Sequence, residues 1–258
     1  MVYINAISSH NTLKTDIKEL ISNPVVRRRM STIVKYGVAV GMECIKEVGS
    51  ENVDAIITAT GLGCLADSEK FLKIIIENNE DLLNPTPFIQ STFNTVGGQI
   101  ALLCENHSYN MTYTHRGSSL ESALLDAILL IENDEAKNVL VGAFDFNIPT
   151  LEEVLKGLKL WQGKELGEGS FFFLLSKEKT PQSIAGISLP EFLSEPVKKE
   201  ELSEKYDNLL YNKYEKSGVF HTASASVLFD ALSDLKKDTH IYNSYLNNQP
   251  TLTHLYVL

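Results

Sequence analysis

The segment Tyr113–Asn133 reads YTHRGSSLESALLDAILLIEN and decides the fold. Strand-forming residues end at a Gly-Ser-Ser turn, and an apolar helix begins at once. In an enzyme with this layout a nucleophile would lie at the turn, activated by the helix N-terminus. Arg116 occupies that position instead. Because the positive end of a helix dipole disfavours a buried cation, we expect Arg116 to pair with an anion or to reach solvent.

The helix that follows this turn is apolar on nearly every face. One stripe consists of Leu120, Ala123, Leu124, Ala127, Ile128 and Ile131, and a second face adds Leu125, Leu129 and Leu130. Such a helix belongs in the interior of a protein. The pattern therefore predicts a layered arrangement in which this helix lies between two sheets.

Strand-like and helix-like segments alternate outward from this helix. Strands are expected at 2–7, 53–63, 109–115, 137–145 and 167–180, and helices at 28–49, 68–79, from about 95, and at 118–133. The order predicts an α/β fold with a mostly parallel sheet covered by helices on both faces. A second turn followed by an apolar helix, at 216–237, predicts a pseudo-duplicated fold. We expect residues 1–180 and a shorter half, 181–258, to pack as one unit.

Composition excludes several classes of function. The 258 residues are 43% hydrophobic, enough for a buried core, and carry a formal net charge of −10. This charge argues against nucleic acid or an anionic membrane as the main partner. The three cysteines suggest neither a disulfide framework nor a metal site, and no glycine run has the spacing of a nucleotide-binding loop. With no signal peptide or membrane-spanning run in sight, we expect a cytoplasmic protein without a cofactor.

Motifs spread along the chain resemble those of the β-ketoacyl synthases of the thiolase-like superfamily. They are ATGLGCLADSEKF at 59–71, TPFIQSTFNTVGGQIAL with Asn94 at 86–102, VGAFD at 141–145, GEGSFFFLL at 167–175 and YNSYLNNQPTLTHLYV at 242–257. Most specific is KSGVFHT at 216–222, which has the Lys-Ser-x-x-x-His-Thr spacing of the family's catalytic Lys and second His. The resemblance places these two roles at Lys216 and His221.

The departures from the family pattern fall on the catalytic residues. The family's Thr-Ala-Cys-Ser-Ser-Ser-Leu reads Thr-His-Arg-Gly-Ser-Ser-Leu here, so the nucleophilic Cys is replaced by Arg116. The first catalytic His has no counterpart between Ile184 and Lys216, and Tyr-Leu-Asn-Asn-Gln-Pro replaces the family's Gly-Phe-Gly-Gly loop. The resemblance thus implies a layered αβαβα fold with a truncated second half and no intact catalytic set, only the remnants Lys216 and His221.

This combination resembles the chain-length factors, which lack the Cys and pair with a catalytic ketosynthase. It implies a non-catalytic subunit of a 3-oxoacyl-[acyl-carrier-protein] synthase system in polyketide, aryl polyene or fatty-acid-like chain elongation. The expected partners are an active ketosynthase subunit, in a dimer formed through the strand at 109–115, and an acyl carrier protein. Arg27–Arg29 are either a docking patch for that acidic carrier or an ordinary solvated helix start.

Other hypotheses stay open. His115 is a candidate base towards Ser118 or Ser119, although neighbours on a strand point to opposite faces. His221 or a Ser is a candidate for non-classical acyl transfer or hydrolysis. Alternatively, His221 is a hydrogen-bonded core residue, Lys216 a surface residue, and the chain a homodimeric structural protein without acyl chemistry. Trp161 is expected to be a packing residue in a loop.

Overall fold

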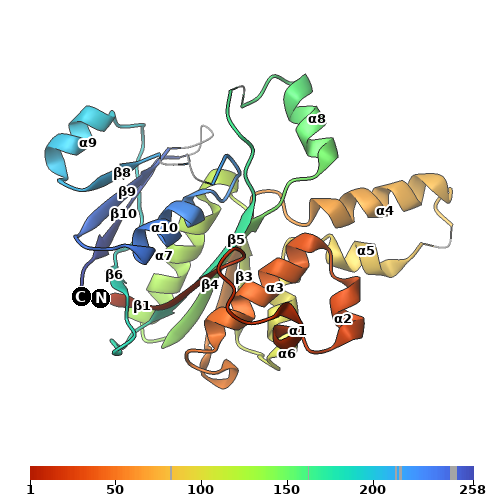
Figure 1. The fold of residues 1–258 in the computed structure, drawn as a ribbon, viewed down its shortest axis with the longest axis horizontal. Helices are drawn as coiled ribbons and strands as arrows, with labels where there is room; N and C mark the ends of the chain where they lie inside the picture. Colours follow the sequence, from red (N-terminus) through yellow and green to blue (C-terminus); the bar gives the residue numbers. More distant parts are fainter. Residues whose placement is uncertain (82, 162, 213, 215–216, 245–248) are drawn as a thin grey trace.

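The computed structural model describes the whole chain except residues 82, 162, 213, 215–216 and 245–248 (Figure 1). Its strands are β1 (Val2–Ser9), β2 (Ala55–Ala59), β3 (Tyr109–Tyr113), β4 (Asn138–Asp145), β5 (Gly169–Ser176), β6 (Ala185–Ile187), β7 (Glu191–Phe192), β8 (Leu209–Tyr211), β9 (Thr239–Asn243) and β10 (Thr251–Tyr256). Its helices are α1 (Ile17–Leu20), α2 (Pro24–Arg29), α3 (Thr32–Ile45), α4 (Leu65–Glu77), α5 (Pro85–Gln90), α6 (Thr95–Leu103), α7 (Ser119–Glu132), α8 (Pro149–Gly157), α9 (Lys199–Lys205) and α10 (Ser224–Ser233), with short 3-10 helices η1 (Ser50–Asn52) and η2 (Arg116–Ser118).

The described strands form one mixed sheet in the order β3-β2-β4-β5-β1-β6-β10-β9-β8, and β7 pairs with β10. β2 is parallel to β3 and to β4, whereas β5 is antiparallel to both β4 and β1. The prediction of a mostly parallel sheet is therefore wrong. β5 runs antiparallel to β4 because α8, which connects them, stays at the carboxyl end of β4 and does not return the chain to the other end. Gly169 at the start of β5 therefore pairs with Asp145 at the end of β4. Hydrophobic periodicity carries no information on strand direction.

The helices divide the sheet into layers. α3 and α6 pack on one face of the β1–β5 half, in a core that includes Val38, Ile100 and Phe172. α7 and α10 lie on the opposite face, between that half and the strands β6, β9 and β10 (Figure 1). α9 packs outside the second half through Leu202. The two halves of this one sheet supply the two β layers, so the order of layers is αβαβα as predicted, but α7 lies between two parts of one sheet rather than between two sheets.

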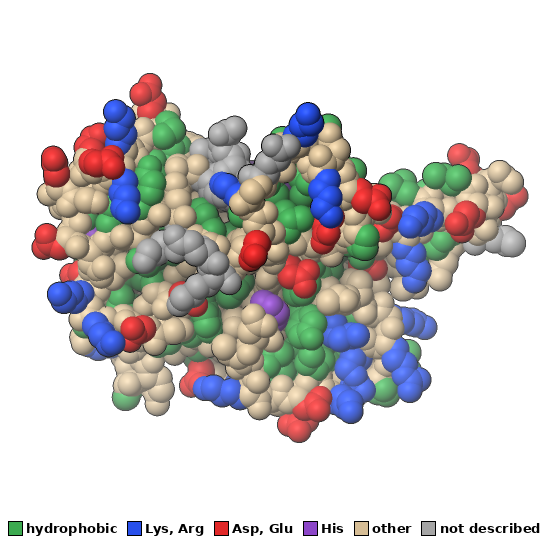
Figure 2. All heavy atoms as spheres, turned by 45° about the horizontal axis from the view of Figure 1, so that its top comes forward, with side chains coloured by type: hydrophobic (Ala, Val, Ile, Leu, Met, Phe, Trp, Pro, Cys, Tyr) green, Lys and Arg blue, Asp and Glu red, His purple; other side chains and the backbone are tan. Residues whose placement is uncertain are grey.

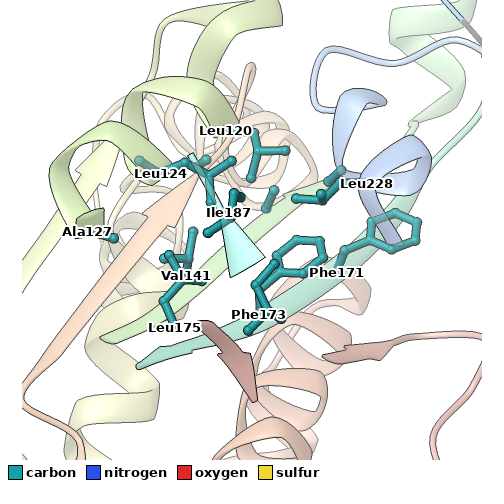
Figure 3. Packing of buried hydrophobic residues seen from close by; sticks show 14 of the residues in the cluster. Leu120, Leu124, Ala127, Val141, Phe171, Phe173, Leu175, Ile187 and Leu228 are labelled. Carbon is teal, nitrogen blue, oxygen red and sulfur yellow. The ribbon is translucent and has the colours of Figure 1, made fainter. Parts of the chain in front are cut away.

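The central core joins side chains from both halves of the chain. Figure 3 shows Leu120, Leu124 and Ala127 of α7 facing Val141 and Phe173 of the first half. In the same cluster lie Ile187 of β6 and Leu228 of α10. The expectation that this helix is interior is confirmed for most of its length, but Leu129 is 41% exposed. The predicted division at residue 180 stays a prediction, and one hydrophobic cluster crosses it.

Helix boundaries differ from the sequence prediction near the N-terminus. The helix expected over 28–49 is divided, because Met30 has the extended ψ of 130° and α3 begins only after Ser31. The structure has a further helix before Thr95, α5, which starts with Pro85 behind an Asn84 cap. None of the helices that the structure describes is long and apolar enough to cross a membrane.

Candidate functional site

Asp145 lies at the carboxyl end of β4 and holds two loops together. Its buried carboxylate accepts hydrogen bonds from the Thr60 hydroxyl at 2.8 Å and from the backbone N–H groups of Gly61 at 3.0 Å and Leu62 at 3.1 Å. The N–H and the hydroxyl of Thr222 donate to it at 3.1 and 2.9 Å. Burial raises the pKa of Asp145, and the bonds from Gly61 and Thr60 oppose this shift. The carboxylate thus fixes the turn after β2 against the start of α10.

The glycines of the turn after β2 make room for this approach. A Cβ on Gly61 would lie 2.0 Å from the Cβ of His221. Gly63 has a φ of +68°, which favours glycine. These glycines serve a turn, and Gly61 additionally allows His221 to pack directly on the backbone.

His221 is half-buried beside this turn. Its ring meets Trp161 edge-on, with 5.5 Å between ring centroids, so Trp161 is the packing residue that was predicted. Among the described residues, no hydrogen-bond partner contacts the buried Nδ1 atom of His221. Burial lowers the pKa of His221, Asp145 opposes the shift, and the positive charge of Arg116 adds to it. At Nδ1 the described residues give no support to the alternative of a hydrogen-bonded core histidine, and the role of His221 stays a prediction.

Arg116 begins the 3-10 turn that leads directly into α7. Its φ of +53° lies in the left-handed region, which a non-glycine residue rarely adopts. The side chain is exposed. Within the described ranges no carboxylate forms an ion pair with it. The prediction that Arg116 pairs with an anion or reaches solvent is confirmed in its second form.

The serines of this turn hold the backbone. The buried hydroxyl of Ser119 lies 3.0 Å from the carbonyl oxygen of Thr60 and 2.7 Å from that of Arg116. Ser118 donates to the carbonyl of His115 at 3.2 Å. The His115 ring instead meets Ser122, with 2.9 Å between Nδ1 and Oγ. The predicted base–nucleophile pairing of His115 with Ser118 or Ser119 is therefore wrong, because the ring points one helical turn further on.

A second buried network, which sequence reasoning missed, lies under the start of α7. The Nδ2 of Asn243 donates to Glu121 Oε1 at 2.9 Å and to the carbonyl of Gly117 at 3.2 Å. Tyr214 donates its hydroxyl hydrogen to Asn243. Burial raises the pKa of Glu121. The network ties the Arg116 turn to β9, and its one sequence signal is a carboxylate in the first turn of a mostly apolar helix.

The site retains few reactive groups. The nearest cysteine to the glycine turn, Cys64, is 1% exposed, and burial raises the pKa of its thiol to about 12, so it is not an available nucleophile. No group of three or more His, Cys, Asp or Glu side chains among the described residues is placed to hold a metal ion. Lys216 and the segment 245–248, where the resemblance predicts a catalytic Lys and part of the closing loop, lie outside the described residues.

The basic triplet Arg27–Arg29 forms the end of α2. Arg27 donates to the carbonyl of Ile21, while Arg28 and Arg29 are exposed. Figure 2 shows Lys and Arg side chains gathered at the corner of the molecule where α2 lies. A docking role for this patch stays a prediction.

A layered αβαβα fold with a glycine turn after β2, a carboxylate at the end of β4 and a sharp turn before a buried helix defines a thiolase-like protein. The family model described as beta-ketoacyl synthase, N-terminal domain, matches residues 6–156. The chain belongs to this family. No curated protein sequence matches the chain significantly.

Two of the solved structures with the same fold are described as containing a chain length factor. The ishigamide ketosynthase/chain length factor aligns with a TM-score of 0.75 and 12% identity over 100% of this chain and 99% of that one. The ketosynthase ApeO in complex with its chain length factor ApeC, from Xenorhabdus doucetiae, aligns with a TM-score of 0.63 and 14% identity over 98% of each chain. AntDE:AntF, a type II acyl-carrier protein in complex with its ketosynthase, aligns with a TM-score of 0.74 and 13% identity over 100% of this chain and 99% of that one. At these identities the likeness shows the fold.

Proposed function

We propose that the protein is a non-catalytic ketosynthase-like subunit of the chain-length-factor type, which pairs with an active ketosynthase in the cytoplasm. The observation that carries this proposal is Arg116 at the position that the resemblance assigns to the nucleophile, on a turn where its φ is +53°. A guanidinium cannot accept an acyl group. Condensation further requires two imidazoles and two oxyanion donors, whereas His221 has no second histidine matched to the family motif.

The similar structures support the choice of partner. Two of them are described as a ketosynthase with a chain length factor, and a third contains an acyl-carrier protein. By analogy, this chain would act in polyketide, aryl polyene or fatty-acid-like chain elongation, and would meet the acyl carrier protein together with its partner. An inactive subunit of the same fold still has a function in such a pair, because it provides the surface on which the active subunit forms its dimer interface.

The exposed edge of the sheet supplies the surface for pairing. β3 is the end strand, bonded on one side to β2. Tyr109 and Met111 of β3 are 42% and 40% exposed, and Leu102 of α6 and Leu129 of α7 flank them at 72% and 41%. An open strand edge with apolar neighbours invites a further strand. We therefore assign the predicted dimer contact to the face formed by Leu102, Tyr109, Met111 and Leu129, called the β3 face below.

Native mass tests the pairing. The chain, purified from its own cells through a mild affinity tag, is expected in a one-to-one complex with a larger, Cys-containing ketosynthase. Met111→Asp should weaken this complex at least about tenfold, since a carboxylate would be buried without a partner. The matched control is Leu189→Asp, at a 38% exposed leucine in the connection between β6 and β7. A homodimer or monomer without a ketosynthase, or equal loss with both variants, would contradict the proposal.

Catalysis by the chain alone is a separate test. Restoring the nucleophile with Arg116→Cys should allow acylation at most, because the chain would still lack the second imidazole. Efficient condensation by this variant without a partner would contradict the non-catalytic role. Stoichiometric labelling of the unaltered chain by an acyl thioester or a fluorophosphonate would instead support an enzyme that uses His221 or a Ser.

A further inference from the structure

Four aromatic rings form a continuous stack on the face of β9 and β10 that α9 covers. His240 of β9 lies directly opposite His254 of β10, and their rings are nearly parallel, with 4.0 Å between centroids and 12° between planes. Tyr206, at the end of α9, stacks on His240 at 3.9 Å, and Tyr256 packs against His254 at 3.9 Å. These four rings, called the His240 stack below, join α9 to the sheet.

The charges around the His240 stack are unevenly distributed. Asp238 Oδ2 lies 3.9 Å from His254 Nε2, and the same carboxylate acts on His240. α9 brings the ammonium of Lys205, next to Tyr206, whereas β8 pairs the uncharged Leu209 with His240. Two further carboxylates act on Lys205, those of Glu191 in β7 and Glu201 in α9. Among the described residues, one carboxylate therefore serves two stacked imidazoles, and both cannot be charged without repulsion.

Protonation of His240 disfavours the closed stack. Burial lowers the pKa of His240, the neighbouring His254 and Lys205 add to this shift, and Asp238 opposes it. A histidine that leaves the stack for water regains the ordinary pKa of about 6.5. The open form therefore binds the proton more tightly than the closed form. The stability that His240 gives to the closed form is complete above this pH and is lost as the pH falls below it.

α9 is attached to the sheet through a small contact. It has seven residues and packs through Leu202 on Tyr242 and Leu252, in a cluster separate from the two large cores. Figure 1 shows α9 at the outer edge of the second half, beside β8. A segment with few buried apolar contacts opens at a lower free-energy cost than the core does. Separation of Tyr206 from His240 is therefore a local event that leaves the rest of the fold in place.

We propose that the His240 stack is a pH-sensitive switch, which holds α9 on the sheet near neutral pH and releases it in mild acid. Release lets His240 turn into water, away from the second imidazole, and uncovers Tyr242 and Leu252, which are 1% and 7% exposed in the closed form. The inference goes beyond the proposed function, because the switch lies in the second half of the sheet and uses neither Arg116 nor the β3 face.

NMR on the purified full chain, between about pH 8 and pH 5 where histidine changes its charge, tests the switch. Contacts between the rings of Tyr206 and His240 are followed by the nuclear Overhauser effect. Hydrogen exchange of the Tyr206 amide, which donates to the carbonyl of Leu202 at 2.9 Å, reports the opening of α9. In acid the ring contacts should be lost. Exchange, corrected for its intrinsic pH dependence, should accelerate by about tenfold for each unit by which the closed stack lowers the pKa of His240.

His240→Phe keeps a ring on Tyr206 that cannot be charged, so the protection of α9 should become independent of pH. The matched control is His107→Phe, at an exposed histidine between α6 and β3, which should keep the response of the unaltered protein. Circular dichroism checks the fold of each variant. If His240→Phe does not fold, His254→Phe replaces it; loss of the neighbouring charge should raise the pKa of His240 and reduce the response.

Two results would overturn the proposal. One is an unaltered protein that keeps its ring contacts and its Tyr206 protection down to the acid end of the range. The other is a response in His240→Phe as large as that of the unaltered chain. Neither result depends on whether a ketosynthase copurifies.

Discussion

Arg116 combines two properties that conflict in isolation. Its φ of +53° is one that arginine adopts at a cost, and its charge lies at the positive end of α7. The turn persists because its surroundings hold it: Ser119 bonds to the carbonyl of Arg116, and Asn243 bonds to that of Gly117. The left-handed conformation of this turn is therefore held by contacts from residues other than Arg116.

Substitutions at Arg116 should follow backbone preference. Arg116→Val is expected to be less stable than Arg116→Gly by about 1–2 kcal/mol, because a β-branched side chain clashes in the left-handed region while glycine does not. Urea unfolding of the two variants measures the difference directly. Equal stabilities would mean that the turn changes its φ on substitution, and would remove the structural reason for treating it as a preserved nucleophile turn.

Glu121 makes the buried network sensitive to pH. Burial raises its pKa above the unfolded value, so the folded protein binds the proton more tightly. Stability from this group is present at low pH and is lost as pH rises through the folded pKa. Glu121→Gln, which keeps an oxygen for Asn243, should therefore stabilise the protein at pH 7 by about 1.4 kcal/mol for each unit of the shift.

The gain from Glu121→Gln should vanish below pH 4, where the carboxyl is protonated in both states. Chemical unfolding at pH 7 and at pH 4 measures it. A variant that is less stable than the unaltered protein at pH 7 would show that the charged carboxylate is well compensated.

Single residues were predictable where a motif or a charge rule applied. Arg116 was assigned from the alignment of its turn, and the dipole of the next helix left two outcomes, an anionic partner or solvent, of which the structure shows the second. Asp145 was part of a motif, but its role in joining two loops depends on Thr222, which is 77 residues away in the chain. Glu121 and Asn243 are 122 residues apart, and no local pattern brings them together.

At the scale of elements, the turn after β2 and the start of α10 form one packed unit. Gly61→Ala should destabilise the protein by about 1–3 kcal/mol, because the new Cβ would overlap the Cβ of His221, which is close to the backbone and cannot move aside. The control is Gly98→Ala in α6, where no atom lies within 4 Å and alanine should stabilise the helix by about 0.5–1 kcal/mol.

Thermal unfolding of both glycine variants provides the measurement, and the His221 NMR signals report whether the ring moves. An unchanged midpoint and unchanged His221 signals in Gly61→Ala would contradict the close approach. A loss of stability in Gly98→Ala as large as that in Gly61→Ala would show that the effect is not specific to the turn.

The elements themselves were predicted well where apolar periodicity was long. α7 and β4 appear close to their expected bounds, and α6 begins at Thr95 as predicted. The split between α2 and α3 was missed, because it lies in the backbone of Met30, whose ψ is 130°, and apolar periodicity does not report a backbone angle. The antiparallel entry of β5 was also missed, because direction depends on where α8 packs rather than on the composition of the strand.

At the scale of the molecule, the αβαβα order makes the central helices the shared interior of both halves. α7 belongs to the first half and α10 to the second, yet Leu124 and Leu228 lie in the same cluster at 1% and 2% exposure. Neither half can bury this surface alone. The prediction that residues 1–180 and 181–258 form one unit therefore has a measurable consequence in unfolding.

Leu124→Ala and Leu228→Ala should each destabilise the whole protein by about 2–5 kcal/mol and lower one common unfolding midpoint. Leu158→Ala, at a leucine that is 64% exposed, is the control and should change stability by less than about 0.5 kcal/mol. Urea unfolding followed by circular dichroism and by the fluorescence of Trp161, the one tryptophan of the chain, makes the comparison. Coincident transitions mean that the two halves unfold together. If Leu228→Ala shifted one of two separate transitions while Leu124→Ala shifted the other, the halves would be independent domains, and the β3 face could bind a partner without the second half being folded.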